Sequence, residues 1–193
     1  MTGLLALSLV AIAVALLRGG SLAGWSQVQV RWWPLAVASL GVQLILHNPP
    51  VDRQPWAITF GPLIWSVCLA AILTVLVRNV FASELRATRL AWTVAALGVG
   101  LNLLVVAANG GFMPQSYEAR SITRGASVST VTDDSRLRNV VPMSDATRLN
   151  ALGDVIPEPA WLPKTNVISI GDVLLGGGLA VWAFATTRRR RIA

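Results

Sequence analysis

Five apolar runs, each near the length of a membrane span, constrain what this chain can fold into. A helix that crosses the ~30 Å hydrocarbon core needs about 17–25 mostly apolar residues. The runs cover residues 2–17, 33–46, 57–77, 90–108 and 168–187, and the second, with 14 residues, is the weakest. Charged residues make up only 13% of the chain, against about a quarter in soluble domains. These features predict an all-α polytopic membrane helix bundle forming a single domain over residues 1–193, and they exclude a soluble or disordered chain.

The first run also has the length of a secretory signal peptide. Ser21-Leu22-Ala23 has the small residues of a cleavage site. No basic residue precedes the run, however, and Arg18 follows it, which reverses the charge order of a signal peptide. We therefore expect an uncleaved span with the N-terminus outside. The bundle has four spans instead of five if the first run is removed or the second is re-entrant.

Basic residues predict the orientation of the bundle. With five spans, nine of them fall on one side, in segments 18–32, 78–89 and 188–193, whereas the short connection 47–56 on the other side carries only Arg53. The positive-inside rule then places the basic tail in the cytoplasm. It also places residues 109–166 outside the cell membrane.

The charge of +7 invites a nucleic-acid interpretation, which we set aside. Four of the charges are Arg188–Arg191, which anchor a span at an anionic inner leaflet. The expected partner is therefore the lipid bilayer and not nucleic acid. Tryptophans at the ends of the runs fit an interfacial belt, namely Trp32, Trp33, Trp56, Trp92 and Trp161.

The outer segment of 58 residues is long for a connection without structure or function. We predict a short helix from Ser144, as N-cap, to Gly153, as a left-handed stop. The Ser/Thr/Asp-rich residues 123–135 predict a mobile tip. The extracytoplasmic segment as a whole is therefore expected to be structured around a mobile middle.

Two interpretations apply to the motif that ends the fourth run, Asn109-Gly110-Gly111-Phe112-Met113-Pro114. Asparagine and glycine tolerate positive φ, and the proline ends the helix, so helix termination explains the pattern. In the functional interpretation, the backbone amides exposed here bind a ligand at the outer membrane boundary.

Two aspartates flank the entry to the last run. Asp172, in Ser169-Ile170-Gly171-Asp172, has the spacing of a capping box and is also an ionisable residue at the start of a span. Asp154, in Gly153-Asp154-Val155, has the pattern of a turn. If both reach one cleft, two carboxylates within hydrogen-bond reach share a proton and can activate water.

Other chemistries lack their residues. The single Cys68 excludes a disulfide framework, the single His47 excludes a histidine zinc triad, and no Gly-rich phosphate loop is present, so no metal or cofactor is expected. Asn102, in mid-span, is expected to bond a neighbouring helix. Small residues four apart predict that the fourth and fifth spans pack together and bring Asn109 near Asp172; they are Ala96 and Gly100, and Gly176 and Ala180.

The three motifs together resemble an uncharacterised bacterial family of small multi-pass membrane proteins with a domain of unknown function. The ordered residues that carry the resemblance are Asn109-Gly110-Gly111-x-Met113-Pro114, Thr147-Arg148-Leu149-x-x-Leu152-Gly153-Asp154-x-Ile156-Pro157 and Ser169-x-Gly171-Asp172. The resemblance implies the fold class and the membrane location but no activity.

A looser similarity is to lipoprotein signal peptidases, which are aspartic enzymes of the bilayer. The similar stretches are Gly153-Asp154-Val155-Ile156 and Asn166-Val167-Ile168-Ser169-Ile170-Gly171-Asp172. The chain departs from that family in a longer interval between Asn166 and Asp172 and in lacking the motif that carries the first catalytic aspartate.

The leading prediction is a non-enzymatic envelope protein whose outer segment binds a protein or lipid partner. Its aspartates and glycines then hold that segment on the bundle. The alternative is an aspartic intramembrane hydrolase or peptidase with Asp154 and Asp172 as catalytic residues. A transporter ranks last, because few polar residues fall at mid-span.

Overall fold

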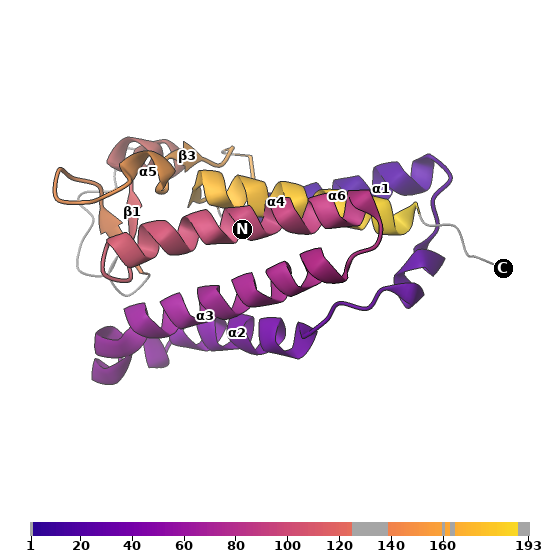
Figure 1. Cartoon of the computed structure of the whole chain (residues 1–193). Coiled ribbons are helices and arrows are strands. Elements are labelled where there is room, and N and C mark those ends of the chain that lie inside the picture. Colours follow the sequence, from indigo (N-terminus) through magenta and orange to yellow (C-terminus); the bar gives the residue numbers. More distant parts are fainter. Residues whose placement is uncertain (1, 125–138, 160, 163–164, 189–193) are drawn as a thin grey trace.

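The computed structural model of the chain describes residues 2–124, 139–159, 161–162 and 165–188, and helices dominate it (Figure 1). The α-helices are α1 (Thr2–Leu17), α2 (Trp33–Leu46), α3 (Pro55–Ala82), α4 (Arg86–Ala108), α5 (Tyr117–Arg124) and α6 (Ile170–Thr187). The 3-10 helices among the described residues are η1 (Leu22–Gln27), η2 (Val51–Arg53) and η4 (Asn150–Leu152). Short strands complete the fold, β1 (Met113–Gln115), β2 (Val140–Pro142), β3 (Ile156–Pro157) and β4 (Val167–Ile168).

The long helices follow the apolar runs with shifted ends. α3 and α4 begin before their runs, and α6 begins two residues after its run because residues 167–168 form β4. Within the described residues, three helices are long and apolar enough to cross a membrane, α3, α4 and α6. α1 and α2 are shorter apolar helices, and at 1.5 Å per residue the 14 residues of α2 reach only about 21 Å. The chain is therefore a helical protein with candidate membrane spans, and five crossings stay a prediction.

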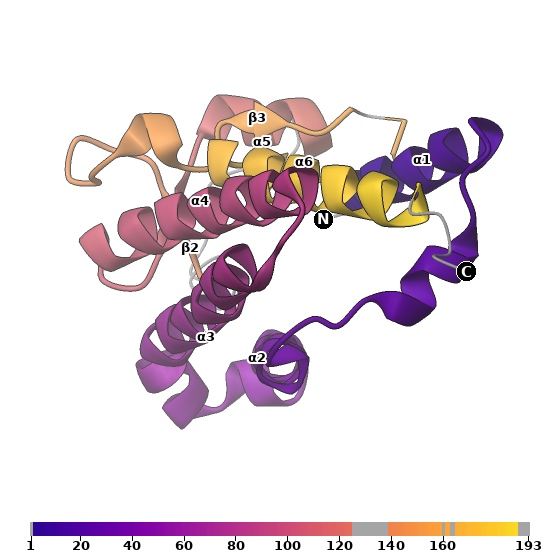
Figure 2. The ribbon, with the colours of Figure 1, turned by 45° about the vertical axis from the view of Figure 1, so that its right-hand side comes forward.

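The five apolar helices lie in a row, in the order α1, α6, α4, α3 and α2 (Figures 1 and 2). At one end of these helices the Ser21 N–H donates to the Thr187 carbonyl at 2.7 Å. At the same end the Arg31 N–H donates to Asn79 Oδ1 at 2.9 Å. We call this end, where α1, α3 and α6 end, the inner end of the helices, and the opposite end the outer end. Along the chain, α1, α2, α3, α4 and α6 therefore alternate in direction, whereas the neighbours α1 and α6 both end at the inner end.

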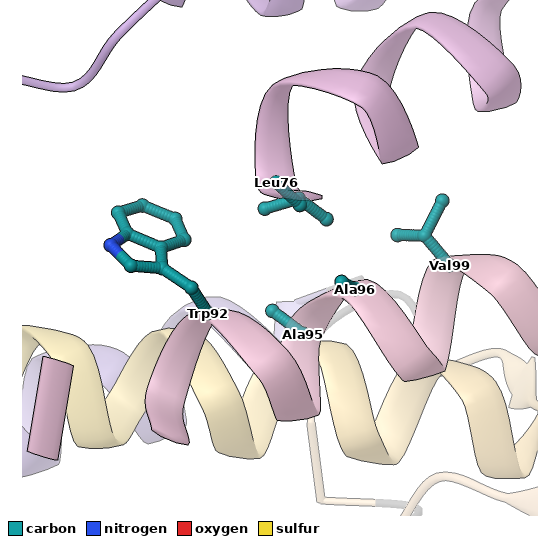
Figure 3. Close-up of a cluster of buried hydrophobic side chains, with 5 residues drawn as sticks. All are labelled: Leu76, Trp92, Ala95, Ala96 and Val99. Carbon is teal, nitrogen blue, oxygen red and sulfur yellow. The ribbon is translucent and has the colours of Figure 1, made fainter. Parts of the chain in front are cut away.

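The core lies along α4, which has α3 on one side and α6 on the other. Leu76 of α3 packs on a stripe of α4 side chains (Figure 3), namely Trp92, Ala95, Ala96 and Val99. Trp92 is 6% exposed and its ring lies 5.1 Å from that of Trp182, so it belongs to the core and not to an outward-facing belt.

The fourth and fifth apolar helices do pack together, but part of the predicted contact face was wrong. A Cβ on Gly100 would meet Leu73 of α3, and Ala96 belongs to the stripe that faces Leu76. The close approach of α4 and α6 is made instead at Gly98 of α4 and at Gly178 of α6. A Cβ on Gly178 would lie 2.6 Å from the Ala91 carbonyl oxygen, so only glycine permits this backbone contact.

Short strands form a small layer at the outer end. β1 pairs with β2 in parallel, and Gln115 of β1 also bridges to Asp154. β3 and β4 form an antiparallel pair next to α5. These pairings bring the beginning and the end of the outer segment together above α4.

The predicted helix 144–153 is wrong, because only η4 forms there. Leu149 has a φ of 57°, which interrupts a helix, and the side chains of Thr147 and Asn150 both donate to the Ser144 carbonyl. Side-chain bonds to the backbone thus hold a loop in place of helical bonds. The predicted mobile tip, residues 123–135, lies outside the described residues except for residues 123–124, which end α5.

Candidate functional site

Asp172 lies in the first turn of α6 and closes a capping box. Its Oδ2 accepts the Ser169 N–H at 3.1 Å, and the Ser169 hydroxyl oxygen accepts the Asp172 N–H at 3.0 Å. The carboxylate also lies at the positive end of the helix dipole, which stabilises a negative charge. The capping interpretation of this motif is therefore confirmed.

Asn102 of α4 joins this box, as a bond from mid-span to a neighbouring helix predicted. Its Nδ2 donates to Asp172 Oδ1 at 2.9 Å, and its Oδ1 accepts the Ser169 hydroxyl at 2.8 Å. The contact requires Gly171, because a Cβ there would lie 2.0 Å from Asn102 Oδ1. Asn109 was predicted to approach Asp172, but Asn102, about two turns earlier, is the residue of α4 that contacts it.

Asp154 is held next to β1 by its backbone and is only 8% exposed. Its N–H donates to the Pro114 carbonyl at 2.8 Å, and its own carbonyl accepts the Ser116 N–H at 2.8 Å. Its Oδ2 accepts a long bond of 3.4 Å from Gln115 Nε2. Gln115 Oε1 in turn accepts from the Arg120 guanidinium of α5 at 2.9 Å.

The environment of Asp154 keeps a proton on its carboxyl group. Burial raises the pKa of Asp154 to about 8, the negative charge of Asp172 adds to this increase, and the bond from Gln115 opposes it. At neutral pH Asp154 is therefore mostly protonated and uncharged. The two aspartates are close enough to interact electrostatically, although Asp172 is already hydrogen-bonded within its own helix turn.

The glycine motif after α4 ends the helix and fastens a loop to it. Gly110 and Gly111 have φ values of 65° and 93°, and the Gly111 N–H donates to the Val106 carbonyl. A Cβ on Gly111 would lie 2.3 Å from Pro62 Cβ of α3. Asn109 Nδ2 donates to the Arg148 carbonyl at 2.9 Å, and Asn109 Oδ1 accepts the Arg148 N–H at 2.8 Å.

The rest of this motif contacts the motif around Asp154. Met113 is buried against Val105 and Val106, and the Pro114 side chain is fully buried. A Cβ on Gly153 would lie 2.5 Å from the Pro114 carbonyl oxygen. The structure therefore brings the first two motifs into direct backbone contact, whereas the third contacts α4 through Asn102.

Sequence reasoning missed two polar residues at the outer end, Asn139 and Gln115. Asn139 is 3% exposed, and its side-chain amide is hydrogen-bonded to His47 Nε2 at the end of α2. Burial lowers the pKa of His47, which favours the neutral imidazole that can accept this bond. Gln115 and Asn139 carried no motif, and their only signal was a polar side chain next to apolar neighbours.

The chemistry available here is that of a protonated carboxyl group, Asp154, and of the capping carboxyl group of Asp172, both in hydrogen-bonded surroundings. Among the described residues, no group of three His, Cys, Asp or Glu side chains could hold a metal ion. The expectation of no cofactor stays a prediction.

Fold and site together define a helical protein with candidate membrane spans and a small layer of strands at one end. Residues 27–184 match the family of unknown function DUF5317. Because the match covers more than half of the chain, the protein belongs to this family. No curated protein and no solved structure matches it.

Proposed function

We propose that this protein is a five-span protein of the bacterial cell membrane whose outer segment is a non-enzymatic binding surface for a protein or lipid partner. The N-terminus is outside and the basic tail is cytoplasmic. The observation that carries the proposal is that the conspicuous polar residues fasten the outer segment. Asn109 bonds to the loop at Arg148 and Asn139 bonds to α2 at His47, while Asn102 holds the start of α6, which follows the segment.

The alternation of helix directions supports this topology. Arg18, Arg31 and Arg78 lie in or next to connections at the inner end, as the positive-inside rule requires of the cytoplasmic side. α1 and α2 are short, but tilt and local thinning of the bilayer accommodate such spans at modest cost.

The topology is tested by labelling single cysteines in intact cells. Replacing the only cysteine, Cys68→Ala, gives a background for Asp145→Cys at the outer end and Glu84→Cys at the inner end. Both positions are exposed. We expect a membrane-impermeant maleimide to label position 145 in intact cells and position 84 only after permeabilisation. The reverse pattern contradicts the proposed orientation.

Binding is tested by a photo-crosslinking amino acid at exposed positions of the outer segment in living cells. Tyr117 and Ile122 of α5 are 57% and 59% exposed. We expect one adduct of discrete mass at these positions and none at Leu97, an exposed residue in the middle of α4. The yield of the adduct should decrease in Asn109→Ala, because this substitution loosens the segment. Identical results at 117, 122 and 97 contradict the proposal.

One observation favours an aspartic hydrolase as a second candidate. Asp154, with its pKa raised to about 8, lies within electrostatic reach of Asp172. Two carboxyl groups that share a proton are the pair that an aspartic dyad uses to activate water.

The two candidates differ in what Asp154→Asn and Asp172→Asn change. The protein is reconstituted in lipid vesicles with a reporter peptide, and products are followed by mass spectrometry. If the protein is a hydrolase, each substitution abolishes the turnover while the protein stays folded. The double variant then loses no more activity than either single variant. The binding proposal expects no turnover by the unmodified protein, and a lower stability only for Asp172→Asn, which loses part of the capping box.

A further inference from the structure

A contact at His47 ties the start of β2 to the end of α2. Asn139 directly precedes β2, and its side-chain amide is hydrogen-bonded to Nε2 of His47, the C-cap of α2. The Asn139 carbonyl in turn accepts the Met113 N–H at 2.8 Å, next to the first pair of the two strands, Met113 opposite Val140. Asn139 is 3% exposed, so the contact is shielded from water. The His47 imidazole therefore joins the β1–β2 pair to α2.

This contact needs a neutral imidazole ring. The Asn139 amide N–H requires an acceptor at His47 Nε2, whereas both ring nitrogens of an imidazolium are donors. Burial lowers the pKa of His47, and the charge of Asp52 opposes this decrease. His47 is therefore neutral at neutral pH and gains a proton below its ordinary pKa of ~6.5. Protonation then leaves two donors facing each other in a buried contact.

Asp52 of η2 offers the charged ring a second partner. The chain folds back towards His47 after α2, because the Asp52 N–H donates to the Asn48 carbonyl at 3.3 Å. Asp52 Oδ1 is buried and has no hydrogen-bond partner among the described residues. A buried acceptor without a partner is costly, and a charged donor is a particularly strong partner for a carboxylate. An imidazolium at position 47 supplies such a donor.

The other side chains around the ring carry no charge. Trp65 of α3 meets the His47 ring edge to face, with 6.4 Å between the ring centroids. Gln43 lies one turn earlier on α2, and its Oε1 accepts the Trp65 Nε1–H at 3.2 Å. Among the described residues, Asp52 is the charged group that acts on His47. The choice open to a protonated ring is therefore between Asn139 and Asp52.

We propose that His47 is an acid-operated switch that exchanges Asn139 for Asp52 and so releases β2 from α2. At neutral pH the ring accepts from the Asn139 amide, and the β1–β2 pair is fastened to α2. In acid the ring binds a proton from water and donates to Asp52 Oδ1, so the Asn139 amide loses its acceptor. The switch acts between α2, η2 and β2, and it requires neither the proposed membrane topology nor a partner.

The single histidine of the chain makes its titration directly measurable by NMR. Full-length protein with isotope-labelled histidine and a histidine-free tag is titrated in detergent. We expect a neutral ring with its proton on Nδ1 at the start and a midpoint below pH ~6.5. Asp52→Asn should lower the midpoint further, because the charge that favours the imidazolium is lost, whereas the exposed Asp145→Asn should leave it in place. A midpoint that Asp52→Asn does not move contradicts the switch.

Hydrogen exchange tests whether the switch releases β2. Protection factors of residues 140–143, corrected for the intrinsic effect of pH on exchange, are compared at about pH 7.5 and about pH 5, on either side of the ordinary histidine pKa. We expect a several-fold loss of protection in acid in the unmodified protein and none in His47→Gln, whose side chain stays uncharged and keeps an acceptor. Asp154 cannot cause this loss, because its raised pKa makes the folded state more stable as the pH falls.

Two results overturn the proposal, namely an equal loss of protection in His47→Gln and no loss in the unmodified protein. If His47→Gln does not fold, the same comparison is made with Asp52→Asn. Its protection at about pH 5 should then exceed that of the unmodified protein, because fewer rings are charged at that pH. Equal protection of the two proteins at this pH would contradict the switch.

Discussion

At the residue scale, two aspartates of the same outer layer have opposite surroundings. Asp172 accepts hydrogen bonds from the Asn102 amide and the Ser169 N–H. Asp154 is buried and accepts one long bond from Gln115. The difference comes from which backbone N–H groups each carboxyl group can reach, because Asp172 begins a helix and Asp154 lies beside a strand.

The raised pKa of Asp154 predicts a pH dependence of stability. Between the ordinary pKa of an unfolded aspartate, ~4, and the folded value of about 8, the folded state keeps a proton that the unfolded state releases. Stability should therefore decrease as the pH rises through this window, by at most ~1.4 kcal/mol per pH unit, and level off above it. Asp154→Asn should flatten the curve of unfolding temperature against pH from 5 to 9 in detergent. The exposed Asp145→Asn is the control, and an unchanged slope in Asp154→Asn would refute the assignment.

Two adjacent glycines of α6 provide a matched pair for the contact with α4. A Cβ on Gly178 would lie 2.6 Å from both the Ala91 carbonyl oxygen and the Ala95 nitrogen, whereas a Cβ on Gly177 meets nothing within 4 Å. Gly178→Ala should lower the free energy of unfolding by about 1–3 kcal/mol, because the two helix backbones must separate. Gly177→Ala should be neutral or slightly stabilising, because alanine favours helix. Thermal unfolding in detergent measures both, and equal effects would contradict this packing.

At the element scale, the outer segment is built from pieces that are too short to be stable alone. β1 to β4 have two or three residues each, and η4 has three. Their order comes from contacts with α4 and with each other, above all through Asn109 and Pro114. The predicted helix 144–153 failed for this reason, because side-chain bonds to Ser144 and from Asn109 compete with helical backbone bonds.

The hydrogen bonds from the Asn109 side chain to the loop at Arg148 predict a local effect of Asn109→Ala. The substitution removes the side-chain bonds to both backbone groups of Arg148, each worth about 1 kcal/mol. Hydrogen exchange of residues 144–152 should become several-fold faster, while exchange in α3 stays the same. Asn48→Ala is the control, because Asn48 bonds only locally, to the Leu44 carbonyl. Unchanged exchange in 144–152 would show that the loop is held by other contacts.

At the scale of the whole molecule, α4 organises the row of helices. It contacts α3 and α6, and its outer end contacts β1 and η4. α1 lies outside residues 27–184, which match the family, yet it packs along α6. The connection after α1 is tied to the end of α6, where Trp25 Nε1 donates to Thr187 Oγ1 at 3.1 Å.

This attachment predicts that α1 stays in the mature protein. Cleavage after Ala23 would leave the side of α6 that α1 covers without its partner. We expect the intact mass of protein purified from membranes to include residues 2–23. A mass that lacks them would show that the first apolar run is a signal peptide and would leave four apolar helices.

The sequence by itself determined the helical class, the places of the apolar helices, the capping box and the family resemblance. These follow from local hydrophobicity and from short-range spacing in the chain, such as that of Ser169 and Asp172. Only the tertiary structure decided that Gly98 and Gly178 make the close contact between α4 and α6, that Trp92 is buried, and that Asn102 reaches Asp172. It also decided that Asp154 is buried beside Gln115. The reason is physical: which face of a helix is covered, and how far a carboxyl group lies from water, depend on residues distant in the chain that only folding brings together.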